Sequence, residues 1–241
     1  GVRSNTNILK KLHKLINKHK LNYVSTWNAA DIFGTGFEKN LGIIGMSGQR
    51  GANKAIFESD LLICLGTHLS IPHTTTLYKD YAKNAKKVIV NIDKDQLNNL
   101  NLKFDLKINC DLNYFLFFFI KIKKKNKEFW ITDVFKKQNW YTPKITKKPN
   151  SDLFINLLTK KIKNKCIIVD GGGTALYSGF QSSYLYNGDR LICSSSISSM
   201  GTGLAESIGT SSSKMFKNYL CIIGDGSFLM NIQDIQTIVQ K

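Results

Sequence analysis

The feature that most constrains the fold of this chain is an apolar run near its carboxyl end that stops at three turn-forming residues. Residues 220–223 (Leu-Cys-Ile-Ile) predict a buried strand, and residues 224–226 (Gly-Asp-Gly) predict the turn that ends it. An amphipathic helix is predicted to follow, with an apolar face made of Phe228, Ile232, Ile235, Ile238 and Val239. Asp225 is therefore expected at the carboxyl edge of a strand, where α/β sheets bind ligands.

A turn at that edge suits a phosphate and its metal ion. Backbone N–H groups at the start of a helix favour phosphate, and a carboxylate beside them suits Mg²⁺, which bridges to phosphate oxygens. Gly-Asp-Gly alone is weak evidence and would more simply be a plain turn. The longer string from Gly224, Gly-Asp-Gly-Ser-Phe followed by Met-Asn-x-Gln-Asp, resembles the diphosphate motif of thiamine-diphosphate enzymes. The resemblance implies that Asp225 binds Mg²⁺ and that Gly224, Gly226 and Ser227 contact the diphosphate.

A second string, residues 169–174 (Val-Asp-Gly-Gly-Gly-Thr), follows another predicted strand. Three glycines let backbone N–H groups approach a ligand closely, which favours a binding loop. The alternative interpretation of the glycines is a flexible loop without a ligand. By resemblance to the same family, Gly173 and Thr174 contact the diphosphate. Acetolactate synthases usually carry Gln-His at these two positions, so the sequence departs from that group here.

The third string, residues 198–209, looks like the family's Ser-Met-Gly-x-Gly-Leu-x-x-x-Ile-Gly pattern. A lone methionine would more simply fill a core. Within this pattern the resemblance implies that Ser199 and Met200 contact the cofactor. It also implies that Met200 is the catalytic residue, wedged between the two cofactor rings with its backbone carbonyl facing the pyrimidine amino group. That role is one of positioning, because the cofactor carries the chemistry itself.

Strands and helices alternate along the chain, which predicts an α/β fold of two Rossmann-like, doubly wound parallel-sheet units. Predicted strands cover residues 22–26, 60–66, 88–92, 166–169, 190–193 and 220–223, and predicted helices cover 5–20, 50–59, 111–120, 151–162 and 175–180, with one more from 201. Ser151 is the expected N-cap of its helix. The first part of the chain resembles the central domain of acetolactate-synthase-like enzymes. We expect that central domain, without its first strand, at residues 1–117, an interdomain connection at 118–150, and the beginning of the thiamine-diphosphate-binding domain at 151–241.

Both units are expected to be truncated, so that the chain is a piece of a longer protein. No segment matches the family's pyrimidine-binding domain with its glutamate, and the family's second metal ligand, an asparagine, lies further downstream of Gly226 than the chain extends. The implied function is that of a 2-keto acid decarboxylating and carboligating enzyme, similar to acetolactate synthase, which uses thiamine diphosphate and Mg²⁺ and assembles as a homodimer or homotetramer. The alternative is a degenerate α/β remnant without turnover. The isolated chain is expected to bind the cofactor weakly at best and not to turn over.

The charge of the chain raises the question of a nucleic-acid partner, because its net charge is +17. Only three of the 34 basic residues are arginines, the side chain best suited to bidentate phosphate and base recognition. We therefore expect no nucleic-acid partner, and a solvated lysine surface that includes the run at residues 121–127.

The cysteines and the apolar stretches indicate the compartment. None of the five cysteines forms a C-x-x-C pair, and four of them (Cys64, Cys166, Cys193 and Cys221) lie in or beside apolar runs, which predicts buried free thiols under reducing conditions. No signal peptide is recognised. The most apolar stretch, residues 112–120, is shorter than the roughly 20 residues of a membrane span. We expect a cytoplasmic protein without a membrane partner.

We also expect no tightly bound FAD. In flavin-containing members of the family, the strand that corresponds to the one before Gly66 runs into an arginine and an acidic pair. Here it continues as Thr67-His68-Leu69, and His68 and His73 are interpreted as ordinary loop residues. Purified protein is expected to release no flavin on heating, as measured by absorption and fluorescence of the supernatant. A stoichiometric yield of FAD would contradict this interpretation.

Overall fold

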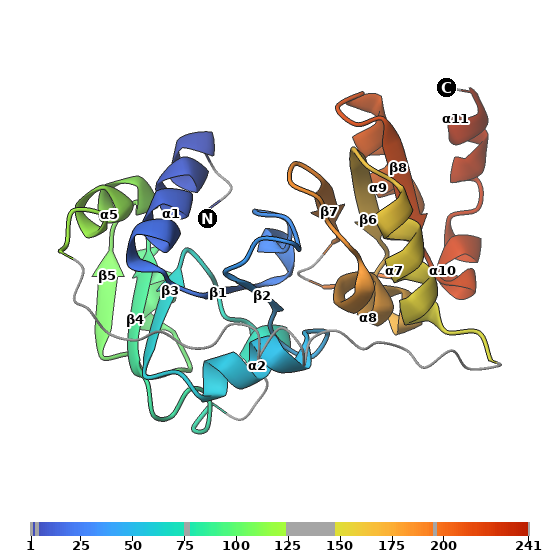
Figure 1. Cartoon of the computed structure of the whole chain (residues 1–241). Coiled ribbons are helices and arrows are strands. Elements are labelled where there is room, and N and C mark those ends of the chain that lie inside the picture. Colours follow the sequence, from blue (N-terminus) through green and yellow to red (C-terminus); the bar gives the residue numbers. More distant parts are fainter. Residues whose placement is uncertain (1, 3–4, 75–77, 124–147, 195–196, 241) are drawn as a thin grey trace. The chain divides into compact units, whose positions relative to one another are not determined.

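The computed structural model of the chain describes residues 2, 5–74, 78–123, 148–194 and 197–240. The chain divides into two compact units. Unit 1 comprises Gly1–Ala29 and Glu38–Asn139, and unit 2 comprises Ala30–Phe37 and Trp140–Lys241. All strand pairs among the described residues are parallel, and helices alternate with strands along the chain (Figure 1). The predicted α/β class with parallel sheets is confirmed.

Unit 1 contains two small parallel sheets. The first pairs β1 (Tyr23–Ser25) with β2 (Asn40–Ile43), and the second has the strand order β3-β4-β5. The remaining elements are α1 (Thr6–His19), η1 (Trp27–Ala29), α2 (Arg50–Phe57), β3 (Leu61–Leu65), α3 (Ile71–Thr74), β4 (Lys86–Asn91), α4 (Lys94–Asn98), β5 (Leu106–Asn109) and α5 (Leu112–Phe119).

Helix α1 illustrates how the sequence sets local structure in unit 1. The Asn5 side chain caps it by accepting a hydrogen bond from the Asn7 N–H at 2.7 Å. At its other end Lys20 adopts the left-handed conformation, and its N–H donates to the last carbonyls of the helix. The buried residues of α1 recur at helical spacing: Ile8, Leu12, Leu15 and Ile16. This apolar face accounts for the packing of α1 on α5.

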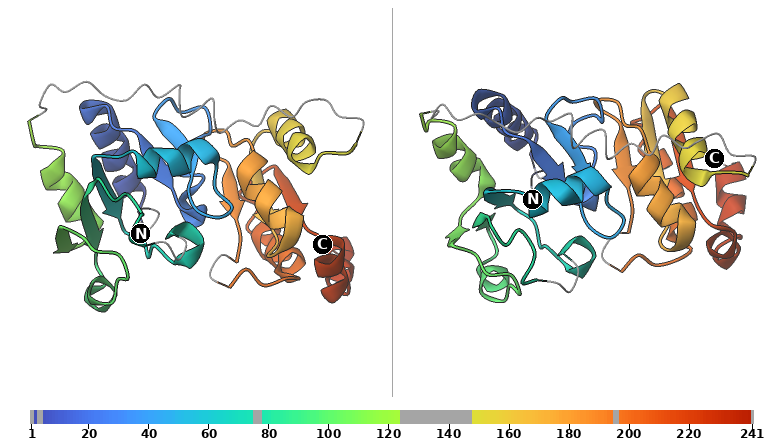
Figure 2. Two further views of the ribbon diagram at one scale, coloured as in Figure 1. Left: turned by 90° about the horizontal axis from the view of Figure 1, so that it is seen from below. Right: turned by 60° about the horizontal axis from the view of Figure 1, so that its bottom comes forward.

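Unit 2 is built around a three-stranded parallel sheet with the order β7-β6-β8. Its elements are α7 (Ser151–Lys161), β6 (Lys165–Val169), α8 (Gly173–Ser182), β7 (Arg190–Ile192), α9 (Thr202–Ser212), β8 (Asn218–Ile222), α10 (Asp225–Met230) and α11 (Asp234–Gln240). All five residues of β6 are buried, as expected of a central parallel strand covered on both faces. The same sheet and its helices can be followed in two other views (Figure 2).

Helices cover both faces of this sheet. A Cβ added at Gly179 of α8 would lie 2.8 Å from a methyl group of Val169, and one added at Gly203 of α9 would lie 3.3 Å from the Cys221 sulfur. Cys221 is the register partner of Ile168, and successive residues of a strand point to opposite faces. Val169 and Cys221 therefore face opposite sides, so α8 and α9 form the outer layers of a three-layer unit.

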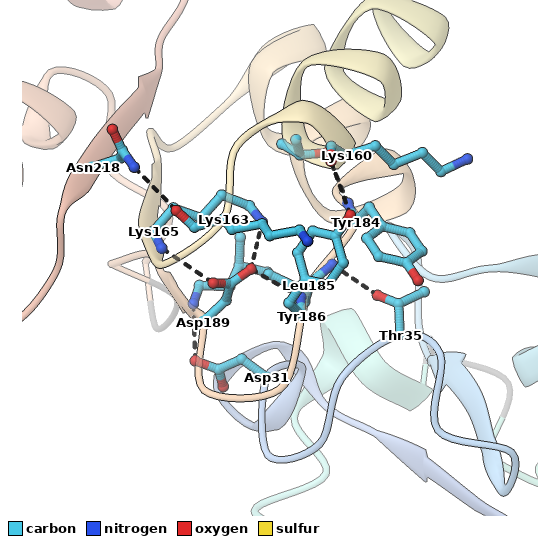
Figure 3. A network of polar contacts seen from close by, with 12 residues as sticks. Asp31, Thr35, Lys160, Lys163, Lys165, Tyr184, Leu185, Tyr186, Asp189 and Asn218 are labelled. Carbon is cyan, nitrogen blue, oxygen red and sulfur yellow. Dashed lines mark hydrogen bonds and ion pairs between the residues drawn. The ribbon is translucent and has the colours of Figure 1, made fainter.

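A buried polar network closes the end of unit 2 at which β6 begins (Figure 3). The Lys165 ammonium forms an ion pair with Asp189, and the two side chains are 0% and 2% exposed. Asp189 also accepts hydrogen bonds from the Lys165 N–H at 3.1 Å and the Tyr186 N–H at 2.8 Å. These bonds satisfy the carboxylate, which is the condition under which a buried ion pair is tolerated.

The segment Ala30–Phe37 belongs to unit 2, although its neighbours in sequence belong to unit 1. Asp31 accepts a hydrogen bond from the Leu191 N–H at 2.8 Å and pairs with Arg190 at 2.9 Å. The Thr35 hydroxyl accepts from the Leu185 N–H at 3.0 Å. This segment therefore supplies polar partners to β7 and to the loop before it (Figure 3).

Several predictions about single elements are wrong. Strand β5 was not predicted, because its residues are mostly exposed and show no apolar run. Strands β3 and β8 were predicted as buried, yet both lie at sheet edges and are only partly covered. The N-cap of α7 is Asn150, which accepts from the Leu153 N–H at 2.9 Å, and Ser151 is the first helical residue.

The predicted single helix after residue 226 is in fact two helices. α10 ends at Met230 and α11 begins at Asp234, and the Asp234 N–H donates to the Asn231 carbonyl in the turn between them. No residue of α11 is buried, and three residues of the apolar face that predicted one long helix are exposed: Ile232, Ile238 and Val239.

The cysteine prediction holds in part. All five cysteines are free, and Cys64 and Cys166 are buried. Cys193 is half-buried and Cys221 is exposed, because β8 lies at an edge of the sheet. In the lysine run, Lys121 and Lys123 are exposed. Its later residues, with most of the predicted connection at 118–150, lie outside the described residues. No helix among the described residues is both long and apolar enough to cross a bilayer.

The buried ion pair makes a prediction about stability. Replacing Asp189 by Asn leaves the Lys165 ammonium buried without its counter-charge, and is expected to lower the free energy of unfolding by about 3–5 kcal/mol. Chemical denaturation measures this change. The matched control is Glu58→Gln, which removes the exposed partner of Lys54 at 3.5 Å and is expected to cost less than about 1 kcal/mol. Equal losses of unfolding free energy in the two variants would contradict the presence of a buried ion pair between Lys165 and Asp189.

Candidate functional site

Three loops of unit 2 meet at one edge of its sheet. Strands β6, β7 and β8 are parallel, so the loops that follow them leave from the same edge. Residues 170–172 follow β6, residues 193–201 follow β7, and residues 223–224 follow β8. All of the residues predicted to bind the cofactor lie on these loops or in the first turns of the helices that follow them.

Met200, on the loop after β7, lies between Gly172 on the loop after β6 and Gly226 in the first turn of α10. A Cβ added at Gly172 would lie 3.1 Å from the Met200 Cγ atom, and one added at Gly226 would lie 3.7 Å from its terminal methyl group. The Met200 side chain is nevertheless 50% exposed. The structure therefore places this side chain against two glycine turns with one side open, and not in the hydrophobic core.

The loops after β6 and β7 are packed backbone against backbone. A Cβ added at Gly171 would overlap the carbonyl groups of Ser198 and Ser199. Only glycine allows this approach, which is the reason for at least one of the three consecutive glycines. Gly172 and Gly173 have φ angles of +91° and +58°, the left-handed region in which glycine is favoured.

Asp170, the residue after β6, was not predicted as a site residue. It is fully buried. One of its oxygens accepts a hydrogen bond from the Gly203 N–H at 2.8 Å, and the other accepts from the Gly201 N–H at 3.4 Å. These N–H groups belong to the start of α9, where a carboxylate is stabilised by both the free donors and the helix dipole. Asp170 thus ties the end of β6 to the loop that carries Met200.

Acidic and thiol groups behind this loop have altered pKa values. Burial, together with the charges of Glu206 and Asp170, raises the pKa of the Cys193 thiol to about 12. Burial also raises the pKa of the Glu206 carboxyl, to which the Asp170 charge adds. The Cys193 thiol is therefore protonated at neutral pH, and it is not a candidate nucleophile.

The predicted diphosphate-binding residues differ in their surroundings. A Cβ added at Gly173 or Gly224 would meet no atom within 4 Å. Thr174 is exposed at the start of α8, whereas Ser227 is buried in α10. The open space at Gly173 and Gly224 leaves room for a diphosphate group, so these two positions fit the predicted cofactor.

Asp225 is exposed and begins α10. One carboxylate oxygen accepts a hydrogen bond from the Gly226 N–H at 2.8 Å. Gly226 was predicted to contact the diphosphate, and its N–H is directed at Asp225. No group of three or more His, Cys, Asp or Glu side chains able to hold a metal occurs among the described residues. A metal ion at Asp225 would therefore need further oxygen ligands from phosphate or water, which is the usual arrangement for Mg²⁺.

The two histidines of unit 1 that follow β3 differ from each other. His68 is exposed and contacts Gln96. His73 lies in α3, contacts Ser70 at 3.0 Å and packs edge-on against Trp27. Burial lowers the pKa of His73 to about 4, so its ring is neutral at physiological pH. This packing is that of a structural residue.

Comparisons with known proteins point to one family. Residues 1–117 match the family described as "Thiamine pyrophosphate enzyme, central domain", and residues 170–241 match "Thiamine pyrophosphate enzyme, C-terminal TPP binding domain". The chain is 30% identical over 214 residues to the probable acetolactate synthase large subunit of Methanocaldococcus jannaschii, covering 82% of this chain and 35% of that protein. It is 29% identical to the acetolactate synthase large subunit of Lactococcus lactis, covering 91% and 39%, and 26% identical to the isozyme 2 large subunit of Escherichia coli, covering 83% and 36%. The chain thus spans between 35% and 39% of the length of these relatives.

The close contact between the first two loops can be tested with paired glycine substitutions. Gly171→Ala forces a methyl group into the backbone at Ser198 and is expected to destabilise the protein by about 1–3 kcal/mol. Gly209→Ala is the control, because Gly209 lies in helix α9 with no atom within 4 Å of its added Cβ. The control is expected to stabilise the protein by about 0.5–1 kcal/mol. Thermal unfolding measures the change in stability of both variants. An unchanged stability in Gly171→Ala would contradict the packing of the loops.

Proposed function

Since this chain belongs to the thiamine pyrophosphate enzyme family, we propose that its three loops in unit 2 bind the diphosphate half of thiamine diphosphate, with Mg²⁺ held at Asp225. The observation that carries the proposal is the position of Met200 between Gly172 and Gly226, beside the open space at Gly173 and Gly224. These residues come from three separate strings of the sequence. Each string resembles the family, and in the fold they meet at one sheet edge.

The residues have different roles in this proposal. Asp225 supplies a carboxylate oxygen to Mg²⁺. Contacts to the diphosphate come from small residues on two of the loops: Gly173, Thr174, Gly224, Gly226 and Ser227. Ser199 and Met200 contact the rest of the cofactor, and the exposed Met200 side chain supports its rings. The Gly226 N–H donates to the Asp225 carboxylate. A diphosphate oxygen bound here would compete with that carboxylate for the same N–H.

Thiamine diphosphate, when bound, serves as the electron sink for decarboxylation of a 2-keto acid and transfer of the remaining acyl unit to an acceptor carbonyl. The residues of this chain position the reacting groups. The Met200 carbonyl would orient the pyrimidine amino group, and its half-exposed side chain would contact the cofactor rings between the loops. We propose an acetolactate-synthase-like activity of this kind for the protein, which would act as a homo-oligomer.

The domain organisation follows from the same proposal. Residues 1–117 form a central domain, residues 118–150 a connection, and residues 151–241 a part of the cofactor-binding domain. The alternative is a module of the same fold that no longer turns over. Gly173-Thr174 stands where acetolactate synthases usually carry Gln-His. The approach of Met200 to Gly172 and Gly226 supports a retained site with a different diphosphate contact or substrate.

Cofactor binding can be tested at Asp225. Asp225→Asn removes the charge that faces Mg²⁺ and is expected to weaken Mg²⁺-dependent thiamine diphosphate binding by about 10- to 100-fold, since a charge-assisted contact contributes about 1.5–3 kcal/mol. Calorimetric titration of the protein at its full native length measures the effect. Asp234→Asn is the matched control, because Asp234 starts the next helix and has no place in the proposed site. Equal affinity in wild type and Asp225→Asn would contradict the assignment, and absence of binding by the wild type would refute the proposed function.

A further inference from the structure

Gly201 is the joint between Met200 and helix α9. It is buried and has φ +86° and ψ −9°, the left-handed conformation that favours glycine. A Cβ added here would lie 3.1 Å from the Met230 Cβ atom and 3.2 Å from the Asn231 side-chain nitrogen. The chain therefore turns sharply at this position, in a space that other residues enclose.

Two side chains hold the peptide groups on either side of Gly201. On the amino side, Asp170 accepts a hydrogen bond from the Gly201 N–H at 3.4 Å, and its second oxygen is fixed by the Gly203 N–H at 2.8 Å. On the carboxyl side, the Asn231 side-chain amide donates to the Gly201 carbonyl at 2.7 Å. Asp170 comes from the loop after β6 and Asn231 from the turn after α10, so the joint is held from two separate segments.

The first of these contacts determines where the Met200 carbonyl points. The Met200 carbonyl and the Gly201 N–H belong to one planar trans peptide group, in which they point in opposite directions. Because Asp170 accepts from that N–H, the Met200 carbonyl is directed away from Asp170. Asn231 holds the next peptide group, Gly201–Thr202, by its carbonyl, and so limits the rotation of the backbone about Gly201 that would let the first peptide turn.

The burial of Asp170 makes its hydrogen bonds from the Gly201 and Gly203 N–H groups necessary for its charge. Asp170 is fully buried, and no lysine or arginine among the described residues forms an ion pair with it. A buried carboxylate without a cation depends on hydrogen-bond donors. The two N–H groups at the start of α9 provide them, so the charge and the loop geometry depend on each other.

We propose that Asp170 and Asn231 are positioning residues that hold the two peptide groups on either side of Gly201, and through them the direction of the Met200 carbonyl toward the pyrimidine half of the cofactor. The inference rests on the proposed function for the identity of that ligand. The fixed peptide itself does not depend on it.

The first arm of the test uses no ligand. Asn231→Ala removes one side-chain donation to a backbone carbonyl, and Asn156→Ala is the matched control because Asn156 donates in the same way to the Ser182 carbonyl at 2.9 Å in the same unit. Amide hydrogen exchange of peptides that cover residues 198–204 is expected to be at least about tenfold faster in Asn231→Ala, and unchanged in the control. Unchanged exchange in Asn231→Ala would overturn the proposal whatever the protein binds. Asp170→Asn, if it folds, is expected to behave as Asn231→Ala.

The second arm separates positioning from general damage to the site. Inorganic pyrophosphate with Mg²⁺ probes only the diphosphate end, whereas thiamine diphosphate also needs Met200. Asn231→Ala is expected to weaken thiamine diphosphate binding at least about tenfold and to leave pyrophosphate binding within about twofold. Equal weakening of thiamine diphosphate and pyrophosphate binding would show that Asn231 has only a structural role, and would overturn the proposal. Binding of neither ligand by the wild type would instead refute the proposed function, and the first arm would still decide whether the peptide is fixed.

Discussion

Unit 2 depends on the parallel pairing of β6 with both β7 and β8, because this pairing places three loops at one sheet edge. β6 can be central because every one of its residues is buried. At its beginning, Lys165 forms a buried ion pair with Asp189, which also accepts a hydrogen bond from the Lys165 N–H. At its other end, Asp170 binds the N–H groups of α9. The strand thus joins the part of the unit that gives stability to the part that forms the candidate site.

Much of this arrangement could be predicted from the sequence. Helices with a regular apolar face or an N-cap side chain, such as α1 after Asn5, and strands with uninterrupted apolar runs, such as β6, have local signals that tertiary contacts did not change. β5 has no such run, because Lys107 and Asn109 interrupt its apolar residues. The break between α10 and α11 has none either, since the apolar residues on both sides keep helical spacing.

The candidate site was predicted from strings that resemble one family, and the structure brings residues of all three together around Met200. Asp170 could not be recognised in the same way. In the sequence it precedes three glycines and looks like part of a turn, while its partners Gly201 and Gly203 lie more than thirty residues away. Asn231 belongs to the string that resembles the family, but the sequence assigned it no contact. Long-range hydrogen bonds to backbone groups leave no periodic pattern from which they could be inferred.

The central claim is that the loops after β6, β7 and β8 form one cradle for thiamine diphosphate and Mg²⁺. The most direct measurement is the change in amide hydrogen exchange across the protein on addition of both ligands. The account predicts slower exchange in peptides covering residues 171–174, 198–203 and 224–227 together, and no change at the Lys165–Asp189 end of the sheet. Slower exchange confined to a single loop, or located mainly in unit 1, would contradict it.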